Sequence, residues 1–116
     1  MCTGSLILGA AGLLQNVKAT SHWAALDCLS LFGAIPISER IVEEVKIMTA
    51  AGVSAGIDMA LTLAVKLCNS QVAQSLQLGI EYDPNPPFDV RSPRKASPAI
   101  LESLRSRLVS AFEKMS

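Results

Sequence analysis

The sequence of 116 residues is poor in aromatic residues, has a single histidine, and has no excess of charge of either sign. Ten Lys and Arg balance ten Asp and Glu, so no electrostatic attraction toward nucleic acid or an anionic membrane is expected. The three cysteines, Cys2, Cys28 and Cys68, fit neither a disulfide framework nor a zinc ribbon, which favours a reducing compartment. No phosphate-binding glycine loop, GxGxxG motif or metal-ligand spacing is present, so we expect no cofactor and no metal.

The sequence also lacks a hydrophobic run that would cross a membrane. The run at residues 5–14 has the length of a signal-peptide core, but no Lys or Arg precedes it. The run at residues 53–67 contains Asp58 and Lys66 and is shorter than the roughly 20 residues that a bilayer requires. We therefore expect a cytoplasmic protein with no membrane partner.

The residues that are present predict a folded α/β protein. Half of them are apolar and 17% are charged, with a mean hydropathy of +0.38, which indicates one globular domain. Helical periodicity and branched apolar residues predict helices over 3–14, 23–32, 57–68 and 71–82, an extended segment over 19–22, and strands over 35–43 and 46–50. We expect Gly33 to cap the second helix, and Cys28 and Cys68 to fill the core. The residues of the second helix expected to face inward are Trp23, Leu26, Leu29 and Leu31.

The C-terminal part has a different composition. The segment 83–98 contains all but one of the six prolines, with Arg91, Arg94 and Lys95 between them, which predicts an extended linker. A final amphipathic helix over 98–114 follows, and the residues predicted to share its apolar face are Ile100, Leu101, Leu104, Leu108 and Phe112. We accordingly divide the chain into residues 1–90 and residues 91–116.

The predicted elements leave the sheet incomplete. Apolar helices such as 5–14 and 53–67 require a sheet to cover them, yet the sequence offers only short strands. The pattern indicates that part of the sheet lies outside this sequence.

Cys2 is the first candidate for chemistry, because it directly precedes an apolar helix. At that position the unpaired backbone N–H groups and the positive end of the helix dipole favour a thiolate, and they can stabilise an anion that develops on a substrate. From spacing alone, a small residue near the end of the chain is the simpler interpretation of Cys2.

His22, the only histidine, is the second candidate. It follows the extended segment that begins at Ala19, and the carboxyl end of a parallel strand is where α/β sheets gather ligands. A buried or capping histidine is the alternative. Asp58 is better explained as a favourable charge at the start of a helix than as a catalytic acid.

Three stretches of the sequence resemble the ThiJ/PfpI family of class I glutamine amidotransferase-like domains. CTGSLILGAAGLLQNVKATSHWAALD resembles the segment after the nucleophile elbow, and TAAGVSAGIDMALTL and LGIEYDPNPPFD continue the match. The last stretch is typical of the isonitrile hydratase branch. The resemblance extends from Cys2 to about Asp89, and it implies a flavodoxin-like three-layer α/β sandwich, of which this sequence resembles the C-terminal half.

The resemblance also implies roles for particular residues. The reactive cysteine of the family is at the position of Cys2, Thr3 replaces a histidine of other branches, and several members have an active-site histidine at the position of His22. The isonitrile hydratase branch also needs an acidic residue near the N-terminus of the domain, and this sequence has no counterpart of it. We therefore expect a fragment that is inactive alone, and a homodimer for the intact protein.

The function implied is the hydration of a small isonitrile to an N-substituted formamide through a cysteine thioimidate. One alternative is a ligand-sensing module like that of AraC-type transcription regulators, although residues 92–116 are too few for their helix-turn-helix domain. A second alternative is a glyoxalase-like, protease-like or stress-protective role, as in other branches of the family.

Overall fold

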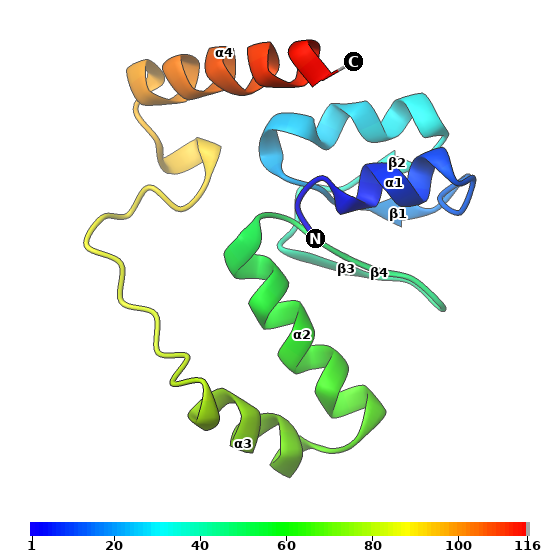
Figure 1. Ribbon diagram of the computed structural model, residues 1–116, viewed down its shortest axis with the longest axis vertical. Coiled ribbons are helices and arrows are strands. Elements are labelled where there is room, and N and C mark those ends of the chain that lie inside the picture. The colour runs from blue at the N-terminus through cyan, green and yellow to red at the C-terminus, as the bar shows by residue number, and fades with distance from the viewer. Residues whose placement is uncertain (116) are drawn as a thin grey trace. The chain divides into compact units, whose positions relative to one another are not determined.

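The computed structural model describes residues 1–115, except for the side chains of Phe112 and Met115. The chain forms two compact units, Met1–Asp83 and the part from Pro84 onward, and each is described by itself. The first unit contains α1 (Gly4–Ala10), β1 (Lys18–Ala19), the 3-10 helix η1 (Trp23–Phe32), β2 (Ile35–Pro36), β3 (Ile41–Glu43), β4 (Met48–Ala50), α2 (Val53–Leu67) and α3 (Ser70–Gly79) (Figure 1).

The strands of the first unit form two short pairs. β1 and β2 are parallel, with Lys18 opposite Ile35, and η1 is the crossover between them. β3 and β4 form an antiparallel hairpin, with Val42 opposite Thr49. The hairpin is joined to β1 by the backbone N–H of Thr20, which donates to Thr49 Oγ1 at 2.9 Å. β1 therefore lies between β2 and the hairpin.

The prediction of one strand over 35–43 is wrong, because the chain bends between β2 and β3. Ile37 N–H still donates to Ala19 O at 2.8 Å, which continues the parallel pairing for one residue. The Thr20 hydroxyl then donates to Glu39 O at 3.0 Å and holds the bend. The residues after the bend pair with β4 instead of β1.

The core of the first unit is small. It consists of Leu14, Ala19, Leu29 and Ala34, with Leu6 and Leu8 of α1 packed against it. Helices α1 and η1 approach closely at Gly9, where an added Cβ would lie 2.7 Å from the Phe32 ring. The inward position predicted for Leu31 is wrong, because 81% of that residue is exposed and Leu29 is the residue of η1 that fills the core.

Several predicted helix ends move in the structure. α1 ends at Ala10 instead of residue 14, because Gly12 adopts a left-handed conformation (φ 81°) that ends the helix in a turn. Gly33 caps η1 in the left-handed conformation, as predicted. Cys28 and Cys68 are both exposed, so their predicted place in the core is wrong.

α2 begins at Val53, four residues earlier than predicted, and it packs against α3 and the hairpin. Within the described residues, only Ala55 and Gly56 of α2 are buried, although the surface of this helix is largely apolar. Leu63 and Val65 remain 40% and 45% exposed, since the hairpin and α3 cover only part of the helix.

The second unit consists of an extended segment, the 3-10 turn η2 (Pro93–Lys95) and α4 (Pro98–Met115). In the extended segment, Asp89 forms ion pairs with Arg91 at 3.3 Å and with Lys95 at 3.2 Å. The helix predicted over 98–114 is confirmed, but Ile100 and Leu104 are more than 40% exposed, and the Phe112 side chain lies outside the described residues. No helix in the described chain combines the length and the apolarity needed to cross a bilayer.

Candidate active site

Cys2 adopts a backbone conformation that L-residues other than glycine seldom use. Its φ angle is 47°, in the left-handed region, which costs on the order of 1 kcal/mol for a residue with a Cβ. The Cys2 N–H donates to Ala51 O at 2.6 Å, directly after β4. The strained turn before α1 is therefore fixed from the carboxyl end of the hairpin.

The carbonyl group of Cys2 is held from the other side by the segment after β1. The Ser21 hydroxyl donates to Cys2 O at 2.8 Å, and His22 N–H donates to the same oxygen at 3.3 Å. Ser21 is only 1% exposed, so its hydrogen bond is shielded from water. The main chain of Cys2 is thus clamped between the ends of β4 and β1.

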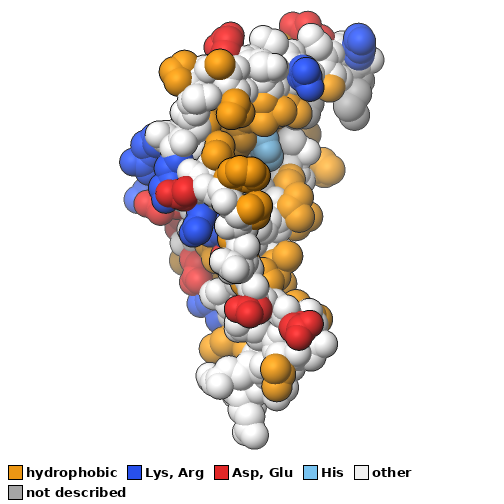
Figure 2. Space-filling model, turned by 90° about the vertical axis from the view of Figure 1, so that its left-hand side faces the viewer, with side chains coloured by type: hydrophobic (Ala, Val, Ile, Leu, Met, Phe, Trp, Pro, Cys, Tyr) orange, Lys and Arg blue, Asp and Glu red, His pale blue; other side chains and the backbone are white. Residues whose placement is uncertain are grey.

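His22 is the N-cap of η1. Its Nδ1 accepts a hydrogen bond from Ala24 N–H at 3.2 Å, and its ring lies 5.4 Å from the Trp23 ring. The side chain is half-buried, and the only histidine of the chain is visible at the surface in Figure 2 (pale blue). Burial lowers the pKa of the imidazole below its usual 6.5, so the ring is neutral at neutral pH.

Thr3 is the N-cap of α1, but its side chain makes no capping hydrogen bond. Neither its hydroxyl nor its backbone N–H has a partner among the described residues. Two residues later, the Ser5 hydroxyl is buried and also lacks a partner within the described residues. The start of α1 therefore presents unused hydrogen-bond donors next to Cys2.

The structure brings the three predicted site residues together through the main chain. Cys2 and Thr3 are adjacent, and His22 contacts Cys2 through its backbone N–H. Across the described residues, no hydrogen bond joins the Cys2 thiol to the His22 ring. Ser21 and Ala51 could not be found from the sequence, because they bind Cys2 through a hydroxyl and a backbone carbonyl group that carry no recognisable pattern.

Asp58 does not occupy the place predicted for it. It is the sixth residue of α2, and it accepts hydrogen bonds from the Tyr82 hydroxyl at 2.6 Å and from Arg40 Nη2 at 2.6 Å. Partial burial raises its pKa, but the hydrogen bonds from Tyr82 and Arg40 and the charge of Arg40 outweigh this and lower the pKa overall. Asp58 joins α2 to the hairpin and to the end of α3.

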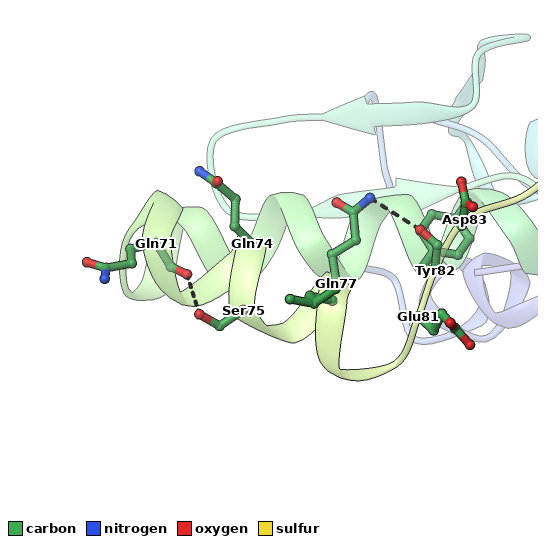
Figure 3. A pocket seen from close by; sticks show the side chains of 8 residues that line it. Gln71, Gln74, Ser75, Gln77, Glu81, Tyr82 and Asp83 are labelled. Carbon is green, nitrogen blue, oxygen red and sulfur yellow. Dashed lines mark hydrogen bonds between the residues drawn. The ribbon is translucent and has the colours of Figure 1, made fainter.

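The cavity seen in Figure 3 lies elsewhere in the first unit. It measures about 760 Å³ and follows α3 and the turn after it, from Gln71 to Asp83. The lining side chains are mostly exposed amides and carboxylates, and none of the three predicted site residues contributes to it. Within the described residues, no three His, Cys, Asp or Glu side chains converge as a metal site would require.

The geometry at Cys2 can be compared with known proteins. The family model described as the DJ-1/PfpI family matches residues 1–66, more than half of the chain, and this range contains the clamped turn and α1. The chain belongs to the DJ-1/PfpI family. The resemblance inferred from the three sequence stretches is therefore confirmed.

Among curated relatives, the chain is 51% identical over 107 residues to the isonitrile hydratase of Pseudomonas putida. This match covers 92% of the chain and 47% of that protein. It is 34% identical over 73 residues to the HTH-type transcriptional regulator CdhR of Pseudomonas aeruginosa, which covers 61% of the chain and 22% of that protein. The chain spans about half the length of the isonitrile hydratase that it matches.

The crystal structure of a ThiJ/PfpI family protein from Pseudomonas syringae superposes with a TM-score of 0.89 at 46% sequence identity. The match covers 97% of this chain and 46% of that one. The observed architecture is therefore a partial DJ-1/PfpI α/β fold.

Proposed function

We propose that this chain carries the nucleophile of an isonitrile hydratase, which adds water to R–N≡C and forms an N-substituted formamide. The observation that carries the proposal is the 51% identity to the Pseudomonas putida enzyme over 107 residues, which is 92% of the chain. The complete domain is proposed to be a flavodoxin-like three-layer sandwich that forms a homodimer.

In the proposed first step, the Cys2 thiolate attacks the terminal carbon of the isonitrile. The sulfur electron pair forms the S–C bond, and an acid donates a proton to the same carbon, which gives a thioimidate, R–N=CH–S–Cys2. The strained turn supports this role, since it presents Cys2 at the start of α1 while its backbone is bonded on both sides. Thr3 supplies a free hydroxyl and a free N–H beside the reacting atoms.

In the second step, water adds to the thioimidate carbon and the C=N electron pair moves to nitrogen, which takes a proton from the water. The C–S bond then breaks, the hydroxyl proton is transferred to the sulfur, and the formamide R–NH–CHO leaves. The Cys2 thiol then returns its proton to the acid of the first step, which regenerates the thiolate. The sum is one isonitrile and one water consumed for one formamide formed.

The acid of the first step is proposed to come from outside residues 1–116. Asp58 is unsuitable because Arg40 and Tyr82 already occupy its carboxylate and the pKa of Asp58 is lowered, which keeps it deprotonated. The family resemblance supports an acid in the part of the domain that this chain does not match. We therefore expect residues 1–116 alone to form no formamide.

The test is an assay of formamide formation from cyclohexyl isonitrile by mass spectrometry. Residues 1–116 are assayed alone and after fusion to the N-terminal half of the Pseudomonas putida relative. The fused protein is expected to be active, and Cys2→Ala is expected to abolish its turnover. Cys28→Ala is the matched control, because Cys28 is exposed and has no place in the scheme. Turnover retained by Cys2→Ala excludes the covalent mechanism.

A second candidate is a ligand-sensing role without turnover, and the observation that favours it is the 34% identity to a transcriptional regulator over 73 residues. In that case the fused protein would bind an isonitrile but would form no formamide. Methylglyoxal serves as the substrate of a parallel assay, since conversion of methylglyoxal in preference to the isonitrile supports the glyoxalase-like role.

A further inference from the structure

The two ring nitrogens of His22 have different surroundings. Nδ1 accepts the N–H of Ala24 at 3.2 Å and so caps the first turn of η1. A nitrogen that accepts a hydrogen bond carries no proton, so a neutral ring must carry its proton on Nε2. Among the described residues, Nε2 has no hydrogen-bond partner. The local fold therefore selects one tautomer of His22 and leaves its N–H group unused.

We infer that His22 serves the Cys2 site as a hydrogen-bond donor through Nε2–H, and that it is not the base that removes the proton of the Cys2 thiol. A base needs an available lone pair, and the only lone pair of a neutral imidazole is used here to cap η1. Burial lowers the pKa of the ring, which supports the neutral form that this assignment requires.

The position of the ring supports a role at Cys2. The backbone N–H of His22 donates to Cys2 O, so the two residues are directly linked. The ring also lies near the other side of the clamp, because a Cβ built at Gly52 would be 3.9 Å from His22 Cδ2, and Gly52 follows the Ala51 carbonyl that binds Cys2 N–H. His22 is thus adjacent to both segments that hold Cys2.

The target of this donor rests on the proposed function, whereas the tautomer does not. The nitrogen of R–N≡C has no free lone pair, but the nitrogen of the thioimidate has one. A donor at that nitrogen therefore stabilises the intermediate and not the substrate, and it makes the thioimidate carbon more electrophilic toward water. We assign His22 as a catalytic hydrogen-bond donor for the second step, with no net proton transfer to or from its ring.

The first test measures the tautomer in the 116-residue protein by long-range ¹H–¹⁵N correlation spectroscopy at about pH 8, well above the usual imidazole pKa. The chain has a single histidine, so the assignment is unambiguous. The expected spectrum is that of the Nε2–H tautomer. A predominant Nδ1–H tautomer overturns the inference.

The second test asks whether His22 activates Cys2. The rate of Cys2 alkylation by iodoacetamide is measured against pH in a Cys28→Ser, Cys68→Ser background, in which both replaced residues are exposed. His22→Asn keeps a side-chain acceptor for the Ala24 N–H but cannot reach the position of Nε2. The midpoint of the profile is expected to move by less than about 0.3 pH units, whereas loss of a base or of an imidazolium partner raises a thiol pKa by about a unit or more.

The third test uses the active fusion with cyclohexyl isonitrile and follows the Cys2 adduct by intact mass. His22→Asn is expected to lower turnover on the order of tenfold to a hundredfold and to accumulate the thioimidate. His22→Gln is expected to restore part of the rate, because its amide N–H reaches the position of Nε2. Asn69→Ala removes the N-cap of α3 and controls for the loss of a cap.

The outcomes separate the two proposals. If the unmodified fusion forms neither adduct nor formamide, the proposed function fails, while the tautomer and alkylation results still decide the assignment of His22. If the fusion is active and His22→Asn turns over at the normal rate without adduct, the donor role of His22 is wrong.

Discussion

The surroundings of Cys2 and the α2–α3 region are held together by different forces. Around Cys2 the contacts are main-chain hydrogen bonds, from Cys2 N–H to Ala51 O and from His22 N–H to Cys2 O, close to a small dry core. In the α2–α3 region, exposed ion pairs join α2 to the residues at and before β3, Arg40 with Asp58 and Lys66 with Glu43.

This difference predicts how each region responds to change. Buried contacts are insensitive to salt and sensitive to lost volume, whereas exposed ion pairs are screened by salt and contribute little individually. The candidate site therefore depends on packing and backbone geometry, and the α2–α3 region on ionic strength and pH.

The largest effect is expected from Leu29→Ala. Leu29 is fully buried in the core, and such a truncation costs about 2–5 kcal/mol of unfolding free energy through lost burial and a residual cavity. The matched control is Leu76→Ala on α3, where 49% of the residue is exposed and the cost is expected to be below about 1 kcal/mol. Urea denaturation of the 116-residue protein measures both, and equal costs would remove the distinction between the two regions.

An intermediate effect is expected from pH. The pKa of His22 is lowered in the folded state by burial, so the unfolded chain takes up the proton first as the pH falls below the usual 6.5. The stability that depends on neutral His22 is complete above that pH and is lost as the pH falls toward the folded pKa. His22→Asn has no such titration, so its urea midpoint is expected to change less than that of the parent between about pH 7 and 5.

The smallest effects are expected at the exposed ion pairs. Asp58→Asn weakens the Arg40 pair, whose side chains are 54% and 34% exposed, and should cost about 1 kcal/mol or less at low salt. Lys66→Ala breaks a pair with side chains 52% and 42% exposed and should cost less still. Thermal unfolding at about 0.05 and 1 M NaCl tests this, because both differences should shrink with salt. Costs that persist at high salt would show that these pairs behave like the core.

Features encoded in neighbouring residues could be predicted from the sequence. The apolar periodicity of 23–32 and the glycine after it gave the helix and its cap, and the motif around Cys2 gave the family. Cys28 and Cys68 were misplaced because cysteine is a common core residue, and composition does not say which face of a helix finds a partner.

Features that depend on distant backbone groups could not be predicted. The bend between β2 and β3 depends on Thr20, which is 19 residues from Glu39 in the sequence. No residue near Glu39 indicates that the chain bends there. The clamp on Cys2 similarly joins residues 2, 21 and 51 through groups that every residue or every serine possesses. The position of Cys2 directly before a helix was therefore predictable, whereas its backbone strain and its hydrogen-bond partners were not.

The left-handed conformation of Cys2 places chemistry and stability in opposition. A glycine adopts a φ of 47° without the steric cost of a Cβ, so Cys2→Gly should raise the free energy of unfolding by about 1 kcal/mol while it removes the thiol. The φ angle of Cys2 therefore sets the stability of this turn against the presence of a thiol at the start of α1.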